Sequence, residues 1–126
     1  MTEIRPAEPT DVDRATRTLV RAFADYPFTR HTVDARDHLH RVEELQRLYL
    51  TEIGLRCGRV WVSDDAAAAA VWTTPESTGI LEAFARIAGR VAELSGDRAD
   101  TATAADEALA PLRPLAAAYL SGQVAK

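Results

Sequence analysis

Apolar residues recur every three or four positions over much of the first half of this chain, and that spacing predicts amphipathic helices. The first predicted helix starts from Thr10 as its cap, with Asp11 and Asp13 at the positive end of the helix dipole. It ends before Pro27, because a proline ring disfavours helical geometry in the residue that precedes it. The apolar face of this helix is formed by Val12, Ala15, Leu19, Ala22 and Phe23.

A second helix is predicted from Asp34, as its cap, to about Ile53. Residues 27–33 lie between the two helices and are expected to form a loop. Gly54 and Gly58 are expected to end the second helix, because glycine favours helix termini. The expected buried stripe consists of Leu39, Val42, Leu45, Leu48, Tyr49 and Ile53.

Strand signals occur on both sides of these helices. Residues 2–6 are predicted to form a first short strand. Residues 59–63 are predicted to form a second, because Val60 and Val62 alternate with Trp61 in the pattern of a half-buried strand. Trp61 is expected to pack against the helices, since tryptophan in a strand is most often part of the core.

The alanine run at 66–70 has two interpretations. Alanine favours helices, but a helix of about five residues between a turn and a β-branched run is too short to be stable. A hairpin is therefore predicted, with a turn at Asp64 and Asp65. Its second strand covers residues 67–74 and ends at Pro75.

The last third of the chain returns to helical spacing. Helices are predicted at about 78–95 and 101–110, separated by Gly96 and Asp97. Residues 119–124 are compatible with a further strand. The pattern as a whole predicts an α+β fold with about three antiparallel strands and about four helices.

Composition narrows the class of protein. The chain has 126 residues, so residues 1–126 are expected to form a single domain. A net charge of −4 without a basic cluster argues against nucleic-acid and membrane partners. A single cysteine and the lack of a signal-peptide pattern favour a cytoplasmic location. His38 and His40 are two positions apart on a helix and point to different faces, so no metal site is predicted.

Five segments resemble GNAT-family N-acetyltransferases, and among these the puromycin N-acetyltransferases, in the same order and at similar spacing. They are FADYPFTRHTVD (23–34), RVWVSDD (59–65), AVWTTPES (70–77), AELS (92–95) and LAPLRP (109–114). The resemblance covers about residues 1–115. It implies the N-terminal half of a GNAT-like fold, which begins with a strand, a helix, a loop, a helix and a hairpin.

This resemblance implies transfer of an acetyl group from acetyl-CoA to a primary amine, such as that of an aminonucleoside antibiotic. In the family the amine attacks the thioester carbonyl directly at reacting distance, so no catalytic nucleophile is implied in this chain. The acceptor pocket is walled by the loop between the first two helices and by the central strands. Carried over, the resemblance implies substrate-binding residues Tyr26, Pro27, Arg30, His31, Trp72 and Thr73.

The pyrophosphate-binding turn of the family, Gln/Arg-x-x-Gly-x-Gly/Ala, does not occur in this sequence. That turn presents backbone N–H groups at a helix N-terminus, where phosphate binds. We therefore expect a partial GNAT-like domain: an acceptor-binding half, truncated and inactive, that binds no acetyl-CoA or other cofactor by itself. The edge of its third strand is then expected to pair by self-association or with a complementary GNAT half.

Four of the candidate residues also have a purely structural interpretation. Tyr26 and Pro27 fit a helix stop with a packed ring, Trp72 fits a core residue, and His31 fits a solvated loop residue. Two other functions stay open on the sequence alone. One is a non-catalytic module that binds a small molecule, and the other is an interaction protein that pairs through its sheet edge.

Overall fold

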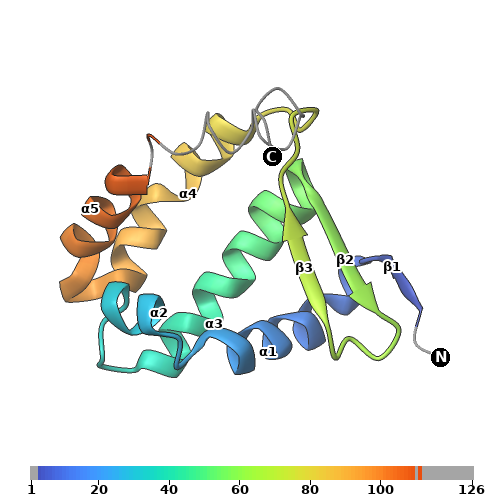
Figure 1. Ribbon diagram of the computed structural model, residues 1–126, viewed down its shortest axis with the longest axis horizontal. Coiled ribbons are helices and arrows are strands. Elements are labelled where there is room, and N and C mark those ends of the chain that lie inside the picture. The colour runs from blue at the N-terminus through green and yellow to red at the C-terminus, as the bar shows by residue number, and fades with distance from the viewer. Residues whose placement is uncertain (1–2, 110, 112–126) are drawn as a thin grey trace, which may run out of the picture.

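The computed structural model describes residues 3–109 and 111 and has the α+β architecture that the sequence predicts. Its antiparallel sheet has the order β1-β2-β3 and consists of β1 (Ile4–Pro6), β2 (Arg59–Ser63) and β3 (Ala69–Trp72). The described helices are α1 (Val12–Phe23), α2 (Pro27–Thr32), α3 (His38–Leu48), α4 (Ile80–Ser95) and α5 (Ala99–Leu109). All of these except α2 have at least eleven residues. The sheet lies at one end of the molecule, and α2 and α5 lie at the other (Figure 1).

The core of the sheet depends on which side chains of β2 face the helices. Val60 and Val62 are buried and pack with Ala15 and Leu19 of α1. Because side chains alternate between the two faces of a strand, Trp61 lies on the opposite face and is 38% exposed. The expectation that Trp61 packs against the helices is therefore wrong.

The hairpin between β2 and β3 is confirmed, and its second strand is shorter than predicted. β3 covers Ala69–Trp72 instead of 67–74. Ala66, in the connection, has a positive φ of 56°. The Thr18 hydroxyl donates a hydrogen bond of 2.5 Å to the Ala66 carbonyl, which attaches the connection to α1. The alanine run therefore forms a turn and a strand, as the argument from helix length predicts.

The start of α1 differs from the prediction. The helix follows a short 3-10 turn, Pro9–Asp11, and Thr10 does not cap it. The Asp11 carboxylate accepts a hydrogen bond of 2.8 Å from the backbone N–H of Glu8 and forms an ion pair of 2.8 Å with Arg5. The bonds from Glu8 and Arg5 thus fix the Asp11 carboxylate and connect the start of α1 to β1.

The predicted loop at 27–33 is wrong, because its first six residues form α2. Pro27 occupies the first helical position, where a missing N–H is tolerated and the fixed φ of proline suits a helix. The Thr32 hydroxyl donates a hydrogen bond of 2.9 Å to the Phe28 carbonyl. A helix this short produces no clear periodic pattern in the sequence.

α3 begins at His38 instead of Asp34, and the later start changes which residues are buried. His38 is 7% exposed, and its Nε2 lies 2.7 Å from the carbonyl oxygen of Ala24. Leu39, predicted to belong to the buried stripe, is 63% exposed. The Asp34 cap and the buried Leu39 were therefore both wrong, because the chain makes a further turn before the helix starts.

The end of α3 also differs from the prediction. A π-helical segment, Tyr49–Leu55, continues the helix through Gly54, and helical geometry stops before Gly58. An added Cβ at Gly54 would lie 2.6 Å from the Val60 side chain and 2.9 Å from that of Val71. Gly54 therefore serves the close approach of helix and sheet and does not act as a helix end.

α4 and α5 lie close to their predicted ranges and are joined by a 3-10 turn, Gly96–Arg98. None of the described helices is both long and apolar enough to cross a membrane. The suggested strand at 119–124 lies outside the residues that the structure describes.

Gly96 lies against the corner between α2 and α3, in a backbone conformation that suits glycine, with φ 64° and ψ −128°. An added Cβ there would lie 2.5 Å from a carboxylate oxygen of Asp34 and 2.9 Å from the Arg41 guanidinium. The backbone N–H of Asp34 also donates a hydrogen bond of 3.0 Å to the Ser95 carbonyl. The position of α5 relative to α2 thus depends on a residue without a side chain.

We predict that Gly96→Ala lowers the free energy of unfolding by at least about 1–3 kcal/mol, the usual range for a strained backbone conformation. Gly89→Ala is the matched control, because an added Cβ at Gly89, within α4, has nothing within 4 Å. It is expected to stabilise the chain by about 0.5–1 kcal/mol through helix propensity. Urea unfolding of both variants measures the difference, and equal effects would contradict the role of Gly96.

Candidate functional site

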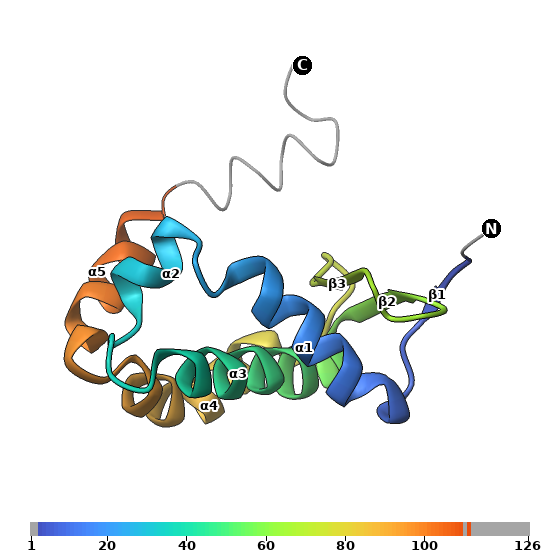
Figure 2. The same ribbon diagram turned by 90° about the horizontal axis from the view of Figure 1, so that it is seen from below.

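An open cavity of about 670 Å³ lies among α2, α3, α4 and α5 and the end of α1. Figure 2 shows α2 and α5 together at the end of the molecule away from the sheet. The volume is in the range of pockets that bind small molecules, about 300–1,000 Å³. We take this cavity as the candidate site.

Beside the half-buried ring of Tyr49, four exposed aromatic rings gather at the cavity, those of Phe23, Tyr26, Phe28 and Phe84. Each is between 39% and 54% exposed, so these rings line the cavity without filling it. Phe23 and Tyr26 pack edge to face, with ring centroids 6.1 Å apart and planes at 82°. Flat apolar surfaces of this kind stack favourably with the ring of a ligand.

Buried aliphatic side chains form the wall of the cavity on α3 and α4. Val42 and Leu45 of α3 and Ile87 of α4 line the cavity and are 1%, 7% and 4% exposed. Val42 and Leu45 come from the stripe that the sequence predicts for the second helix. Because these residues are packed in the core, they form a wall of defined shape.

The polar lining of the cavity is small. It includes Gln46, Tyr49, Thr29, Thr103 and Asp106. Burial raises the pKa of the Tyr49 hydroxyl, and the nearby Asp106 carboxylate raises it further. The hydroxyl of Tyr49 is therefore protonated at neutral pH and able to donate a hydrogen bond.

The wall formed by α4 and α5 is anchored to the corner between α2 and α3. The buried Asp34 carboxylate accepts a hydrogen bond of 3.1 Å from the backbone N–H of Asp97. It also accepts bonds from Arg36, of 2.8 Å from the backbone and 2.7 Å from the guanidinium. Arg41 donates to two carbonyl oxygens in the last turn of α4, at 2.9 and 3.0 Å. These bonds hold the α4–α5 connection in place beside the cavity.

The same bonds keep Asp34 ionised. The hydrogen bond from the Arg36 guanidinium, followed by the backbone bonds from Arg36 and Asp97, holds the pKa of Asp34 well below its usual range. The carboxylate therefore stays charged at neutral pH although it is buried.

Of the sequence-predicted site residues in the segment 23–34, Tyr26 lines the cavity. Pro27 begins α2 and is exposed. Arg30 forms an ion pair with Asp25 and accepts a bond from Arg98 through its carbonyl. His31 is exposed at the end of α2, and none of Pro27, Arg30 and His31 lines the cavity.

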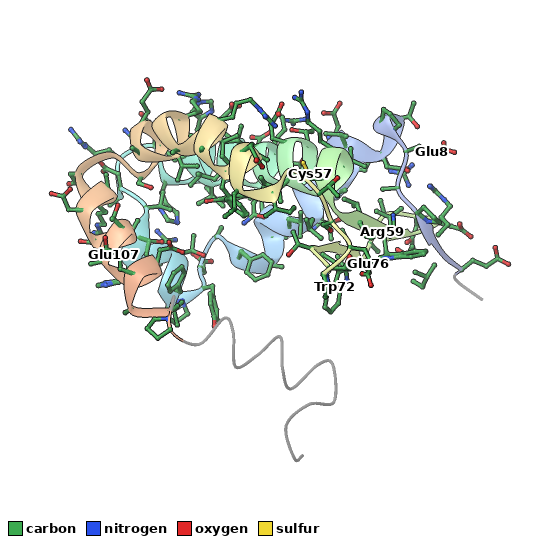
Figure 3. The ribbon with its side chains drawn as sticks, turned by 90° about the horizontal axis from the view of Figure 1, so that it is seen from above. Glu8, Cys57, Arg59, Trp72, Glu76 and Glu107 are labelled. Atoms are coloured by element: carbon green, nitrogen blue, oxygen red, sulfur yellow. The ribbon has the colours of Figure 1, made fainter. Side chains whose placement is uncertain are left out.

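Trp72 and Thr73 belong to a different part of the molecule. Both are exposed at the end of β3, and Trp72 is 58% exposed. Figure 3 shows Trp72 beside Arg59 and Glu76, far from Glu107 on α5. Neither residue lines the cavity, so the structure does not bring the two predicted halves of the acceptor site together.

Sequence analysis did not single out most of the aromatic lining. Phe28 lay in a predicted loop, and Phe84 had the spacing of an ordinary core residue. No periodic signal distinguishes a ring that faces a cavity from a ring that faces the core. The packing of α5 against α2 and α4 creates this distinction.

No known protein-family model matches the chain. Among residues 3–109 and 111, no three His, Cys, Asp or Glu side chains are grouped as a metal site.

We predict that Asp34→Asn lowers the free energy of unfolding at neutral pH. We also predict that this free energy then falls less steeply in acid than it does in the parent chain. Since the folded-state pKa of Asp34 is depressed, its contribution is complete above the unfolded value of about 3.9 and is lost as the pH falls below it. Urea unfolding between about pH 2 and 7 measures this dependence.

Glu107→Gln is the control, because it removes an exposed carboxylate on α5. It is expected to follow the parent pH curve. Asp11, whose pKa Arg5 lowers, stays in both variants, so some acid loss persists. If stability falls at low pH as steeply in Asp34→Asn as in the parent chain, Asp34 is not a source of the acid sensitivity.

Proposed function

We propose that this chain binds an aromatic amine, meaning here an amine that carries a hydrophobic aromatic group, in the cavity among its helices. It would do so as the acceptor-binding half of a GNAT-type N-acetyltransferase. The observation that carries the proposal is the cavity itself, which has about 670 Å³ and five aromatic rings on its walls. An apolar, concave site with few polar groups is the usual form of a small-molecule site.

Two features support an aromatic amine as the ligand. The rings of Tyr26 and Phe84 come from different helical regions and offer stacking surfaces to a flat ligand. Tyr26 also belongs to the segment 23–34, which carries the resemblance to the N-acetyltransferases.

The proposal assigns binding to the described residues and assigns no catalytic residue. In the family, holding the amine at reacting distance is itself a large part of catalysis. A chain that binds the acceptor without transferring an acetyl group fits the same cavity. Mixing the chain with the cofactor-binding half of a related enzyme separates the two, because only an acetyltransferase half would then restore acetyl transfer.

We predict that Tyr26→Ala weakens binding of puromycin, an aromatic amine, by about 5- to 150-fold. Loss of one stacking partner costs about 1–3 kcal/mol. Trp72→Ala is the matched control, because it removes an aromatic side chain that does not line the cavity. Isothermal titration calorimetry compares both variants with the parent chain. Equal losses in the two variants, or none at Tyr26, would place the ligand elsewhere.

A second candidate function is protein interaction through the sheet, and the apolar outer face of the sheet favours it. Ile4, Trp61 and Trp72 are 62%, 38% and 58% exposed on this face. The ladder directs the backbone N–H and C=O groups of Ala69 and Val71 away from β2. β3 carries no charge and no proline, which are the usual protections of a strand edge.

If the sheet is an interaction surface, we predict that the chain self-associates. Trp72→Lys is expected to shift it to a monomer, because a lysine opposes pairing at a strand edge. Leu81→Lys is the control, since Leu81 is 83% exposed on α4. Size-exclusion chromatography with light scattering measures both. A monomeric parent chain with slow hydrogen exchange along Ala69–Trp72 would show that the edge is already covered.

A further inference from the structure

Gln46 interrupts an otherwise apolar surface of α3 at the cavity. α3 presents Val42 and Leu45 to the cavity, and the π-helical segment that continues it presents Tyr49. Gln46 lies one turn from Val42 and one turn from Tyr49 on the same side. A leucine or an alanine would continue the apolar stripe at this position. The amide therefore stands out as a polar group in an apolar wall.

The amide of Gln46 has no hydrogen-bond partner among the described residues, although it is half-buried. The same holds for the hydroxyl of Tyr49, whose pKa is raised by burial. The buried side-chain oxygen that lacks a partner in the described part of the chain belongs to Thr16. The polar atoms of Gln46 and Tyr49 are therefore open to solvent, and both residues line the cavity.

These two groups define a hydrogen-bonding pattern. A glutamine amide presents a donor and an acceptor side by side, and a tyrosine hydroxyl adds a donor that also accepts. The best match to the amide is a ligand group with a neighbouring acceptor and donor, such as a carboxamide or the edge of a heteroaromatic ring. A ligand without such a group displaces water from Gln46 and leaves the amide unpaired, which is unfavourable.

We propose that Gln46, together with Tyr49, is the specificity-determining residue of the cavity and selects aromatic amines that carry a carboxamide or an amide-like ring edge. This inference rests on the proposed function, since it needs an aromatic ligand in the cavity. The aromatic walls supply affinity for any ring of suitable size. The α3 amide distinguishes among such rings, because sites that hydrogen-bond a ligand group reject analogues that lack it.

The test compares two probes that differ by one group, benzylamine and its meta-carboxamide derivative. Both carry the same aminomethyl group on a single ring. Chemical-shift titration of the full chain by NMR measures each dissociation constant. The parent chain is expected to bind the carboxamide about tenfold more tightly, and Gln46→Leu is expected to bind the two probes equally.

His40→Leu is the matched control, because it replaces an exposed polar side chain of α3 that does not line the cavity. It is expected to keep the tenfold preference. Tyr49→Phe is expected to reduce the preference by a smaller factor. Gln46→Met serves as a second variant if Gln46→Leu does not fold, as judged by circular dichroism.

The outcomes separate this inference from the proposed function. If the parent chain binds neither probe and does not bind puromycin, the proposed function itself fails. If the parent chain binds both probes with equal affinity, or if Gln46→Leu keeps the preference, the cavity stands and the role of Gln46 is overturned. Loss of the preference in Gln46→Leu alone supports the inference.

Discussion

The contact between the Asp34 carboxylate and the turn at Gly96 is the constraint on which the cavity depends. Asp34 follows α2, whereas Gly96 follows α4, and an added Cβ at Gly96 would lie 2.5 Å from the carboxylate. The bond from the Asp97 N–H to Asp34 orients the start of α5. α5 has no buried residue of its own, so this connection supplements its packing against α2 and α4.

The molecule has two surfaces of different character at its two ends. The cavity is concave, aromatic and partly polar, and the outer face of the sheet carries exposed Trp61 and Trp72. None of Ile4, Trp61 and Trp72 lines the cavity, and Figure 3 shows Trp72 far from Glu107 on α5, so a ligand in the cavity and a partner on the sheet do not compete for the same residues. The two candidate functions are thus compatible in one chain.

The polar side chains around the cavity differ in whether they have hydrogen-bond partners on the protein. Asp34 is buried but receives several hydrogen bonds, so it contributes to the fold. Gln46 and Tyr49 lack such bonds among the described residues and face an open cavity. A polar group left without a protein partner in a cavity is available to a ligand.

Local periodicity in the sequence was sufficient for the α+β class, the hairpin and the ranges of α4 and α5, because these depend on residues close in the chain. It was not sufficient for α2, whose six residues are fewer than two helical turns. It also failed at Leu39, because α3 starts at His38, whose Nε2 lies 2.7 Å from the carbonyl oxygen of Ala24, a residue distant in the chain.

The candidate site was predicted at one residue, Tyr26, and the tertiary structure decided the rest. The sequence by itself determined that aromatic rings surround the first helix end, because Phe23, Tyr26 and Phe28 are near neighbours in the chain. Only the packing of α5 and α4 against α2 and α3 decided that these rings face a cavity with Phe84 and Gln46. Only the alternation of β2, set by the burial of Val60 and Val62, decided that Trp61 lies outside the core. Burial depends on contacts between residues far apart in the chain, and no local pattern specifies them.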